Sequence, residues 1–209
     1  KLFSRSDSDS SLCDLIRAST KLKSLYLNDR KITLPLLSTI CTCSTLRHVS
    51  FESCALHEDA VNYAGFSAHV TSLSCDDCDT FYKFFPNILE LDADDIHINT
   101  LDKLVVRSRC VKKAILNVER SNSAPEPAIP HSTVLKIVEN WKHIQSLIVD
   151  DSSNTMSERS VAALVTGCAS LTHFATPFRY CRSTRLVSST KLKILDNSFG
   201  PQLQFLDMD

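Results

Sequence analysis

With 209 residues and 43% hydrophobic content, the chain can bury a large core, and its length allows one domain or two. Its formal net charge of -1 gives no bulk attraction to nucleic acid or to an anionic membrane, because proteins that bind these usually present a basic face. No stretch approaches the roughly eighteen apolar residues that a membrane-spanning helix needs. These properties argue against nucleic acid as the partner and against a membrane.

The first part of the chain, residues 1–20, is predicted to be an N-terminal cap or flank. The run from Lys1 to Ser11 is polar and rich in Ser and Asp, and it lacks the apolar segment of a secretion signal. The internal pattern of the chain begins only after this run.

A short apolar motif then recurs, in which one apolar residue is followed three positions later by a second apolar or small residue. Nine residues begin such a match and are called first-position residues: Leu22, Leu46, Val70, Ile88, Val111, Ile144, Leu171, Leu192 and Leu203. Six matches continue to a third apolar or small residue two positions further on, as in Leu22, Leu25 and Leu27. Each match predicts a short strand. Offsets are counted from the first-position residue, which is offset 0, and the residues at offsets 0, 3 and 5 are expected to point inward.

Between these strands, five segments carry the 3.6-residue period of a helix with one buried face: 34–42, 58–66, 100–109, 132–142 and 157–168. Ser157 is the predicted cap of the last segment. The interval from Val70 to Ile88 leaves room only for a short helical turn around residues 80–85. A strand followed by a helix or tight turn, repeated at such intervals, is typical of leucine-rich coils that stack on one another.

Two regions depart from this pattern. Residues 121–130 contain three prolines, which remove backbone donors and prevent a regular helix, so we expect an inserted loop there. Such a loop either carries binding or is a tolerated insertion. Residues 180–209 are predicted to be an irregular C-terminal cap or a truncated repeat, which leaves residues 1–209 as a single repeat domain.

Nine cysteines could indicate disulfides, a metal site or reduced core thiols. Cys43 and Cys168 each lie three residues before a first-position residue, and Cys54 and Cys78 each lie eight residues after one. Cysteines that recur at fixed positions of the repeat are expected to fill equivalent small buried sites as reduced thiols. Reduced thiols in turn predict a cytoplasmic or nuclear protein. The Cys75-x-x-Cys78 spacing invites a zinc or redox interpretation, but both positions are expected to be inward, so we predict structural thiols and no cofactor or metal.

Three segments resemble the cysteine-containing class of leucine-rich repeats: LRHVSFESCALHEDAV at 46–61, FPNILEL at 85–91 and MSERSVAALVTGCASL at 156–171. This class is familiar from F-box proteins, which select substrates for cullin-type ubiquitin ligases. The resemblance covers roughly residues 22–176. It implies an α/β fold, a right-handed solenoid with a parallel concave sheet and with helices or turns on the convex side. No F-box is recognisable, and the Cys/Asn position of the repeat is occupied by Arg30, Ile96, Glu119 and Ser152 in other coils.

If offsets 0, 3 and 5 face inward, then offsets 2, 4 and 6 face outward and form columns across stacked strands. The offset-6 column has four acids and two amides, and the offset-4 column becomes apolar toward the later coils. These columns are the predicted partner-binding residues: Tyr26, Asn28, Ser50, Glu52, Ser74, Asp76, Asp92, Asp94, Ile115, Asn117, Ile148 and Asp150. They indicate a docking surface for a protein with a basic segment, although Asp and Asn also suit strand ends for conformational reasons.

The sequence contains no catalytic motif that would predict an enzyme. The leading hypothesis is a non-catalytic protein-interaction module of the F-box substrate-receptor kind. A scaffold subunit of a larger protein or ribonucleoprotein assembly, with no ubiquitin role, is the alternative. RNA binding is a third hypothesis, which depends on a local basic cluster: Lys103, Arg107, Arg109, Lys112 and Lys113.

Overall fold

The computed structural model describes residues 2–4, 9–76, 78–118, 129–150, 156–175 and 193–194. The chain divides into two compact units, Lys1–Asp94 and Asp95–Asp209, and the boundary falls within strand β7 (Glu90–Ile96). Both units are α/β, with parallel strands. Most of the predicted loop at 121–130 and nearly all of the predicted cap at 180–209 lie outside the described residues.

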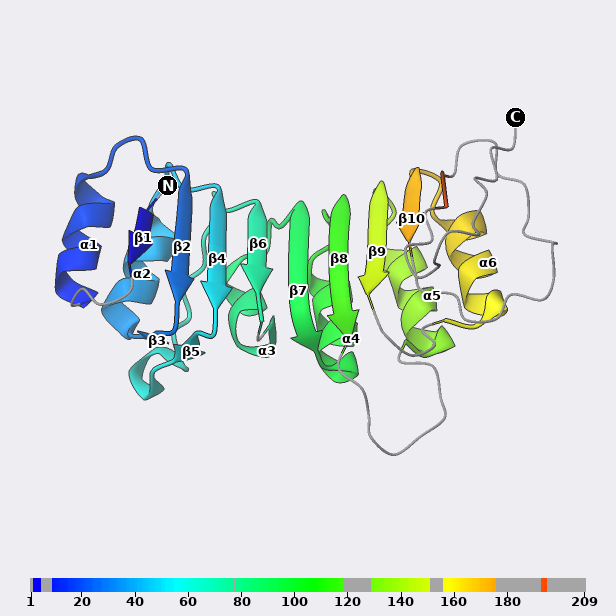
Figure 1. Cartoon of the computed structure of the whole chain (residues 1–209), viewed down its shortest axis with the longest axis horizontal. Coiled ribbons are helices and arrows are strands. Elements are labelled where there is room, and N and C mark those ends of the chain that lie inside the picture. Colours follow the sequence, from blue (N-terminus) through cyan, green and yellow to red (C-terminus); the bar gives the residue numbers. More distant parts are fainter. Residues whose placement is uncertain are drawn as a thin grey trace, which may run out of the picture. The chain divides into compact units, whose positions relative to one another are not determined.

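The first unit is built on a parallel sheet (Figure 1). Its strands, which pair in this order, are β1 (Leu2–Ser4), β2 (Ser24–Asn28), β4 (His48–Glu52), β6 (Ser72–Cys75) and β7. The offset-3 residues pair across β2, β4, β6 and β7 as Leu25, Val49, Leu73 and Leu91, and all four are buried. The offset-5 residues Leu27, Phe51, Cys75 and Ala93 are buried in the same way. The predicted strands and their inward faces are therefore confirmed in this unit.

Short helices connect these strands. They are α1 (Asp9–Ala18), α2 (Leu34–Thr42), the 3-10 turn η1 (Glu58–Ala60), α3 (Cys78–Phe81) and the 3-10 turn η2 (Tyr82–Phe84). Helices α1 and α2 pack together on one side of the sheet (Figure 1). A proline in the first turn of α2 suits the helix start, and the Cys43 amide donates to the Thr39 carbonyl at its end. The helix predicted at 34–42 is confirmed, as is the short turn near 80–85.

The helix predicted at 58–66 is wrong, because only the three residues of η1 are helical there. The apolar residues of the expected stripe, Val61 and Phe66, are exposed. Backbone groups in and after this segment bond elsewhere: the Lys83 ammonium donates to the Val61 carbonyl, and the Ser67 amide donates to the Phe84 carbonyl. These contacts with η2 replace the hydrogen bonds that a longer helix would have made.

A two-stranded parallel pair lies beside the main sheet of the first unit. It joins β3 (Lys31–Ile32) to β5 (Ala55–Leu56), 24 residues further along the chain. Before each of these strands the chain passes through a left-handed residue, Asp29 (φ 51°) and Ser53 (φ 50°). Each is seven positions after a first-position residue, so the two successive coils turn in the same way.

The second unit has the same pattern, in which a helix precedes each of the main strands (Figure 1). The helices are α4 (Ile98–Arg107), α5 (His131–Asn140) and α6 (Glu158–Gly167), and the parallel strands are β8 (Lys113–Val118), β9 (Ser146–Asp150), β10 (His173–Ala175) and β11 (Lys193–Ile194). Ala114, Leu147 and Phe174 pair in register and are buried. Ser157 caps α6 as predicted, since its side chain accepts from the Ser160 amide.

The three helices predicted in this unit are present, displaced by one or two residues at their ends. Trp141 follows α5 and is fully buried. Every described helix is too short or too polar to traverse a lipid bilayer.

Candidate partner-binding surface

In the first unit, the offset-4 residues form a column across four neighbouring strands. Tyr26 pairs with Ser50, Ser50 with Ser74, and Ser74 with Asp92. The alternation of a strand turns these side chains away from the core residues on either side of them. Tyr26, Ser50 and Ser74 are half-buried and Asp92 is exposed, so the column lies at the surface as the sequence predicts.

The offset-6 residues follow at the ends of the same strands. Asn28 pairs with Glu52, and the Asn28 Nδ2 donates to Glu52 Oε2 at 3.0 Å. In the turn after β4, the Ser53 amide donates to Asp76 Oδ2 at 2.8 Å, and Asp94 lies exposed on β7. The hydrogen bonds orient Glu52 and Asp76, but both donors are neutral.

We name Glu52, Asp76, Asp92 and Asp94 the acidic columns. In the described part of the chain, no Lys, Arg or His forms an ion pair with any of these four carboxylates. Their negative charge is therefore available to a partner.

The pKa of Asp92 is shifted by its surroundings on this surface. Although the side chain is exposed overall, the protein atoms that cover part of it reduce its hydration and raise the pKa of its carboxyl above the ordinary value. The neighbouring charges of Asp94 and then Asp76 raise this pKa further. The charge of His48 lowers the pKa of Asp92. The charges of Asp92, Asp94 and Asp76 thus repel one another, and this repulsion is unfavourable to the fold.

Replacing Asp92 with Asn should raise the free energy of unfolding at neutral pH by no more than about 1 kcal/mol, because partly exposed charges are screened. A carboxyl whose pKa is raised by folding destabilises the native state when ionised, and this cost is lost as the pH falls through the raised pKa. The increase in the free energy of unfolding caused by D92N should therefore become smaller as the pH falls. It should vanish once Asp92 of the unmodified chain is protonated in both the folded and the unfolded state. Urea unfolding measured at several pH values tests this.

The control for this prediction is Asp14→Asn, which removes an exposed carboxylate on α1 outside the acidic columns. Asp14 makes only an exposed ion pair with Arg17, at 3.4 Å. An equal or larger gain in D14N, or a D92N gain that persists at low pH, would contradict the role assigned to Asp92.

His48 is a further member of this surface, which the sequence interpretation did not include among the predicted partner-binding residues. It belongs to the offset-2 column, where it pairs with Ser24 and Ser72. Its Nδ1 lies 2.8 Å from Ser72 Oγ, and its ring lies 5.1 Å from the Tyr26 ring. Its offset-2 position already predicts that His48 faces outward. Its contacts could not be predicted from this position, because Tyr26 and Ser72 lie 22 and 24 positions away in the chain.

The second unit carries the remaining predicted residues. Ile115 pairs with Ile148 and Asn117 pairs with Asp150 across β8 and β9. Ile115 is exposed and Ile148 is half-buried, so the predicted apolar patch exists as a pair of neighbouring isoleucines. The Asp150 backbone is part of β9, and its side chain lies outside the described atoms.

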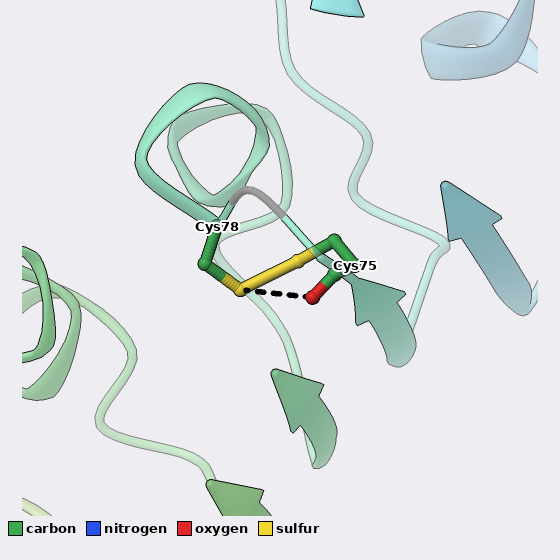
Figure 2. Close-up of a disulfide and its surroundings, with 2 residues drawn as sticks. All are labelled: Cys75 and Cys78. Atoms are coloured by element: carbon green, nitrogen blue, oxygen red, sulfur yellow. Dashed lines mark hydrogen bonds between the residues drawn. A yellow bond between two sulfur atoms is a disulfide. The ribbon is translucent and has the colours of Figure 1, made fainter. Parts of the chain in front are cut away.

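The Cys75-x-x-Cys78 pair is oxidised, which corrects the prediction that these two residues are reduced thiols. Cys75 ends β6 and Cys78 begins α3, and their Cα atoms lie 5.6 Å apart (Figure 2). That separation is within the range that a disulfide requires. Both residues are buried as predicted, and the bond links the end of β6 to the start of α3.

The other described cysteines are free: Cys13, Cys41, Cys43, Cys54, Cys110 and Cys168. Burial raises the pKa of Cys41 to about 12 and that of Cys168 to about 11, and it also raises the pKa of Cys54. These three thiols remain protonated at neutral pH, as expected of small apolar core residues. Within the described ranges, no group of three or more His, Cys, Asp or Glu side chains is placed to hold a metal ion.

A comparison with known proteins gives no independent assignment. Neither a protein-family model nor a curated protein sequence matches this chain significantly.

Proposed function

We propose that the chain is a right-handed leucine-rich repeat solenoid that acts as a non-catalytic protein-interaction module. The support is the register of the strands: Leu25, Val49 and Leu73 pair with one another at a constant separation of 24 residues. The left-handed turns at Asp29 and Ser53 follow the same period. Stacked repeats of this kind present outward side chains as extended columns, which are the usual binding surfaces of solenoids.

The preferred partner on this surface is a protein segment rich in Lys or Arg. The observation that carries this proposal is the set of acidic columns, four outward-facing carboxylates that form no ion pair with a Lys, Arg or His in the described part of the chain. Burial, and then the charges of Asp94 and Asp76, raise the pKa of Asp92, which His48 lowers. A basic segment would relieve this repulsion on binding, and the charge would steer its approach. The half-buried Tyr26 and the neighbouring Ser50 and Ser74 would supply packing and hydrogen bonds beside the charges.

By resemblance to the cysteine-containing repeats, the role is substrate recognition of the F-box receptor type, in the cytoplasm or nucleus. Among the described cysteines six are free, four of them buried, and these support a reducing compartment. The Cys75–Cys78 disulfide is the observation that counts against it. The buried thiols belong to the core that positions the columns.

The alternative is a scaffold subunit with no ubiquitin role. The observation that favours it is the exposure of Val106 on α4 and Leu135 on α5, two helices that pack together in the second unit. Exposed apolar residues on the helices would give a second contact face, as a subunit within an assembly requires.

The acidic columns can be tested with the triple variant Glu52→Gln, Asp92→Asn and Asp94→Asn. Its association rate with a synthetic peptide of alternating Lys and Ser should fall about tenfold at low salt, because charge acts mainly on the encounter rate. Stopped-flow fluorescence gives this rate, and the difference from the unmodified chain should narrow as salt is added.

The matched control is Asp14→Asn, Glu58→Gln and Glu139→Gln, three exposed positions outside the columns. Each triple variant changes the formal net charge from -1 to +2, since three negative charges are removed. The control should keep most of the original rate. Equal slowing in both variants would mean that only net charge matters, and an unchanged rate in the column variant would refute the docking surface.

Identification of the native partner distinguishes the substrate-receptor role from the scaffold role. Affinity purification of the full protein from its own cells should recover a cullin adaptor if the receptor role is correct. A fixed set of unrelated subunits, lost when Val106 and Leu135 are replaced by Ser, would favour the scaffold.

A further inference from the structure

A histidine lies among the outward-facing carboxylates of the first unit. His48 is the offset-2 residue of β4, so it faces the same side of the sheet as the offset-4 residue Ser50. Its partners in register are Ser24 of β2 and Ser72 of β6, and Ser72 pairs in turn with Glu90 of β7. His48 is half-buried and Glu90 is exposed. The offset-2 column therefore places one titratable base on the surface that carries the acidic columns.

Two contacts position the ring of His48. Its Nδ1 lies 2.8 Å from Ser72 Oγ, and its centroid lies 5.1 Å from that of the Tyr26 ring, with an angle of 47° between the two planes. A serine hydroxyl can donate to a neutral imidazole or accept from a protonated one. The Tyr26 ring also tolerates a neighbouring cation, because the face of an aromatic ring attracts positive charge. Neither contact therefore has to break when His48 gains a proton.

Most of the titratable groups that share this face with His48 are acidic. They come from β2, from β4, from the end of β6 and from β7: Tyr26, Glu52, Asp76, Glu90, Asp92 and Asp94. Two cations, Lys23 and Arg47, are exposed just before β2 and β4. Lysine and arginine keep their charge at neutral and mildly acidic pH. Of the basic groups around the acidic columns, His48 is thus the one whose charge changes in this range.

The charge of His48 acts on the acidic columns. It lowers the pKa of Asp92, which burial and the charges of Asp94 and Asp76 raise. An imidazole ordinarily titrates at about pH 6.5 and a carboxyl at about pH 4. Between these values the four carboxylates of the acidic columns keep most of their charge, while protonation of His48 adds a positive charge beside them.

We infer that His48 is a pH switch of the docking surface, which favours a basic protein segment when the ring is neutral and disfavours it when the ring is protonated. This inference rests on the proposed function, because the switch regulates binding of the same Lys- or Arg-rich segment. The direction follows from charge, since an imidazolium repels ammonium and guanidinium groups that approach the carboxylates. The protonated ring also lies against Tyr26, where the proposed partner would pack.

The test compares the association rate of the peptide of alternating Lys and Ser at about pH 8 and at about pH 6, on either side of the ordinary histidine titration. Stopped-flow fluorescence at constant ionic strength should show that the unmodified chain associates about threefold more slowly at the lower pH. His48→Gln keeps a neutral side chain that can still bond to Ser72, so it should lose most of this difference. The matched control is His69→Gln, an exposed position before β6, which should keep the difference.

Two results would overturn the switch alone: equal rates at both pH values in the unmodified chain, or a pH dependence that persists in H48Q. Loss of the pH dependence in H69Q as well would assign it to the overall charge of the chain and would also overturn the switch. If the peptide binds at neither pH, the proposed function and the switch fail together.

A second measurement needs no partner. In the unmodified chain and in Asp92→Asn, the ring protons of His48 can be followed by nuclear magnetic resonance as the pH is lowered. Removal of the Asp92 charge should move the titration midpoint of His48 to lower pH, because a nearby carboxylate favours the protonated ring. An unchanged midpoint would contradict the coupling between His48 and the acidic columns.

Discussion

Replacing Phe51 with alanine should lower the free energy of unfolding by about 3 to 5 kcal/mol, the cost of removing a large buried aromatic side chain. Phe51 is the offset-5 residue of β4 and is only 1% exposed. Its ring stacks on Phe81, with centroids 4.1 Å apart and planes 5° from parallel, and it lies 6.1 Å from the Phe85 ring. The substitution would open a cavity between the sheet and the turn formed by α3 and η2. Urea unfolding followed by far-ultraviolet circular dichroism measures the loss.

The control for this prediction is the neighbouring residue Ser50, which points outward from the same strand. Ser50→Ala should change the free energy of unfolding by no more than about 0.5 kcal/mol, because surface substitutions away from special features are mild. A small effect of F51A, or effects of similar size in both variants, would contradict the assignment of offsets 4 and 5 to opposite faces.

Trp141→Ala should be the most damaging single truncation in the second unit, with an expected loss of about 3 to 5 kcal/mol. Trp141 is fully buried directly after α5, where its amide donates to the Ile137 carbonyl at 2.8 Å and its carbonyl accepts from the Ile144 amide at 3.0 Å. It therefore joins the end of the helix to the start of the next strand segment. Because it is the only tryptophan of the chain, unfolding must be followed by circular dichroism.

A second substitution separates packing from hydrogen bonding at this site. The Trp141 Nε1 is buried without a described acceptor, and an unsatisfied buried donor is itself destabilising. Trp141→Phe removes that donor while keeping a ring, so it should cost clearly less than Trp141→Ala. Exposed Lys142 is the control, and K142A should stay within about 0.5 kcal/mol. Equal losses for W141F and W141A would show that the indole group is essential and would contradict the packing explanation.

The sequence interpretation was most accurate for features that depend on local side-chain direction. Residues 22, 25 and 27 and their equivalents were assigned inward from apolar spacing alone, and those within the described residues are buried. Helix α2 also has the predicted bounds, because Leu36, Leu37 and Ile40 form a helical stripe and a proline occupies its first turn. Local geometry is enough in such cases, since a strand alternates with period two and a helix with period 3.6.

The interpretation was least accurate where distant residues compete for the same backbone groups. Segment 58–66 has a helical apolar pattern, yet Lys83 and Phe84 supply hydrogen-bond partners that a single-segment pattern cannot include. Helix α1 was not predicted within the expected N-terminal flank, although Leu12, Cys13 and Ile16 are buried in it. Its packing against α2, which follows β2 and β3 in the chain, makes this polar segment part of the core.

By itself, the sequence determined which residues face inward, the recurrence of strands and the outward columns that carry acids. Only the tertiary structure decided that Cys75 and Cys78 meet and that His48 contacts Tyr26 and Ser72. The physical reason is the separation along the chain of the residues on which each property depends. Periodicity follows from dihedral preferences within a few residues, whereas bonds, charge interactions and pKa shifts depend on distances in space between residues far apart in the chain.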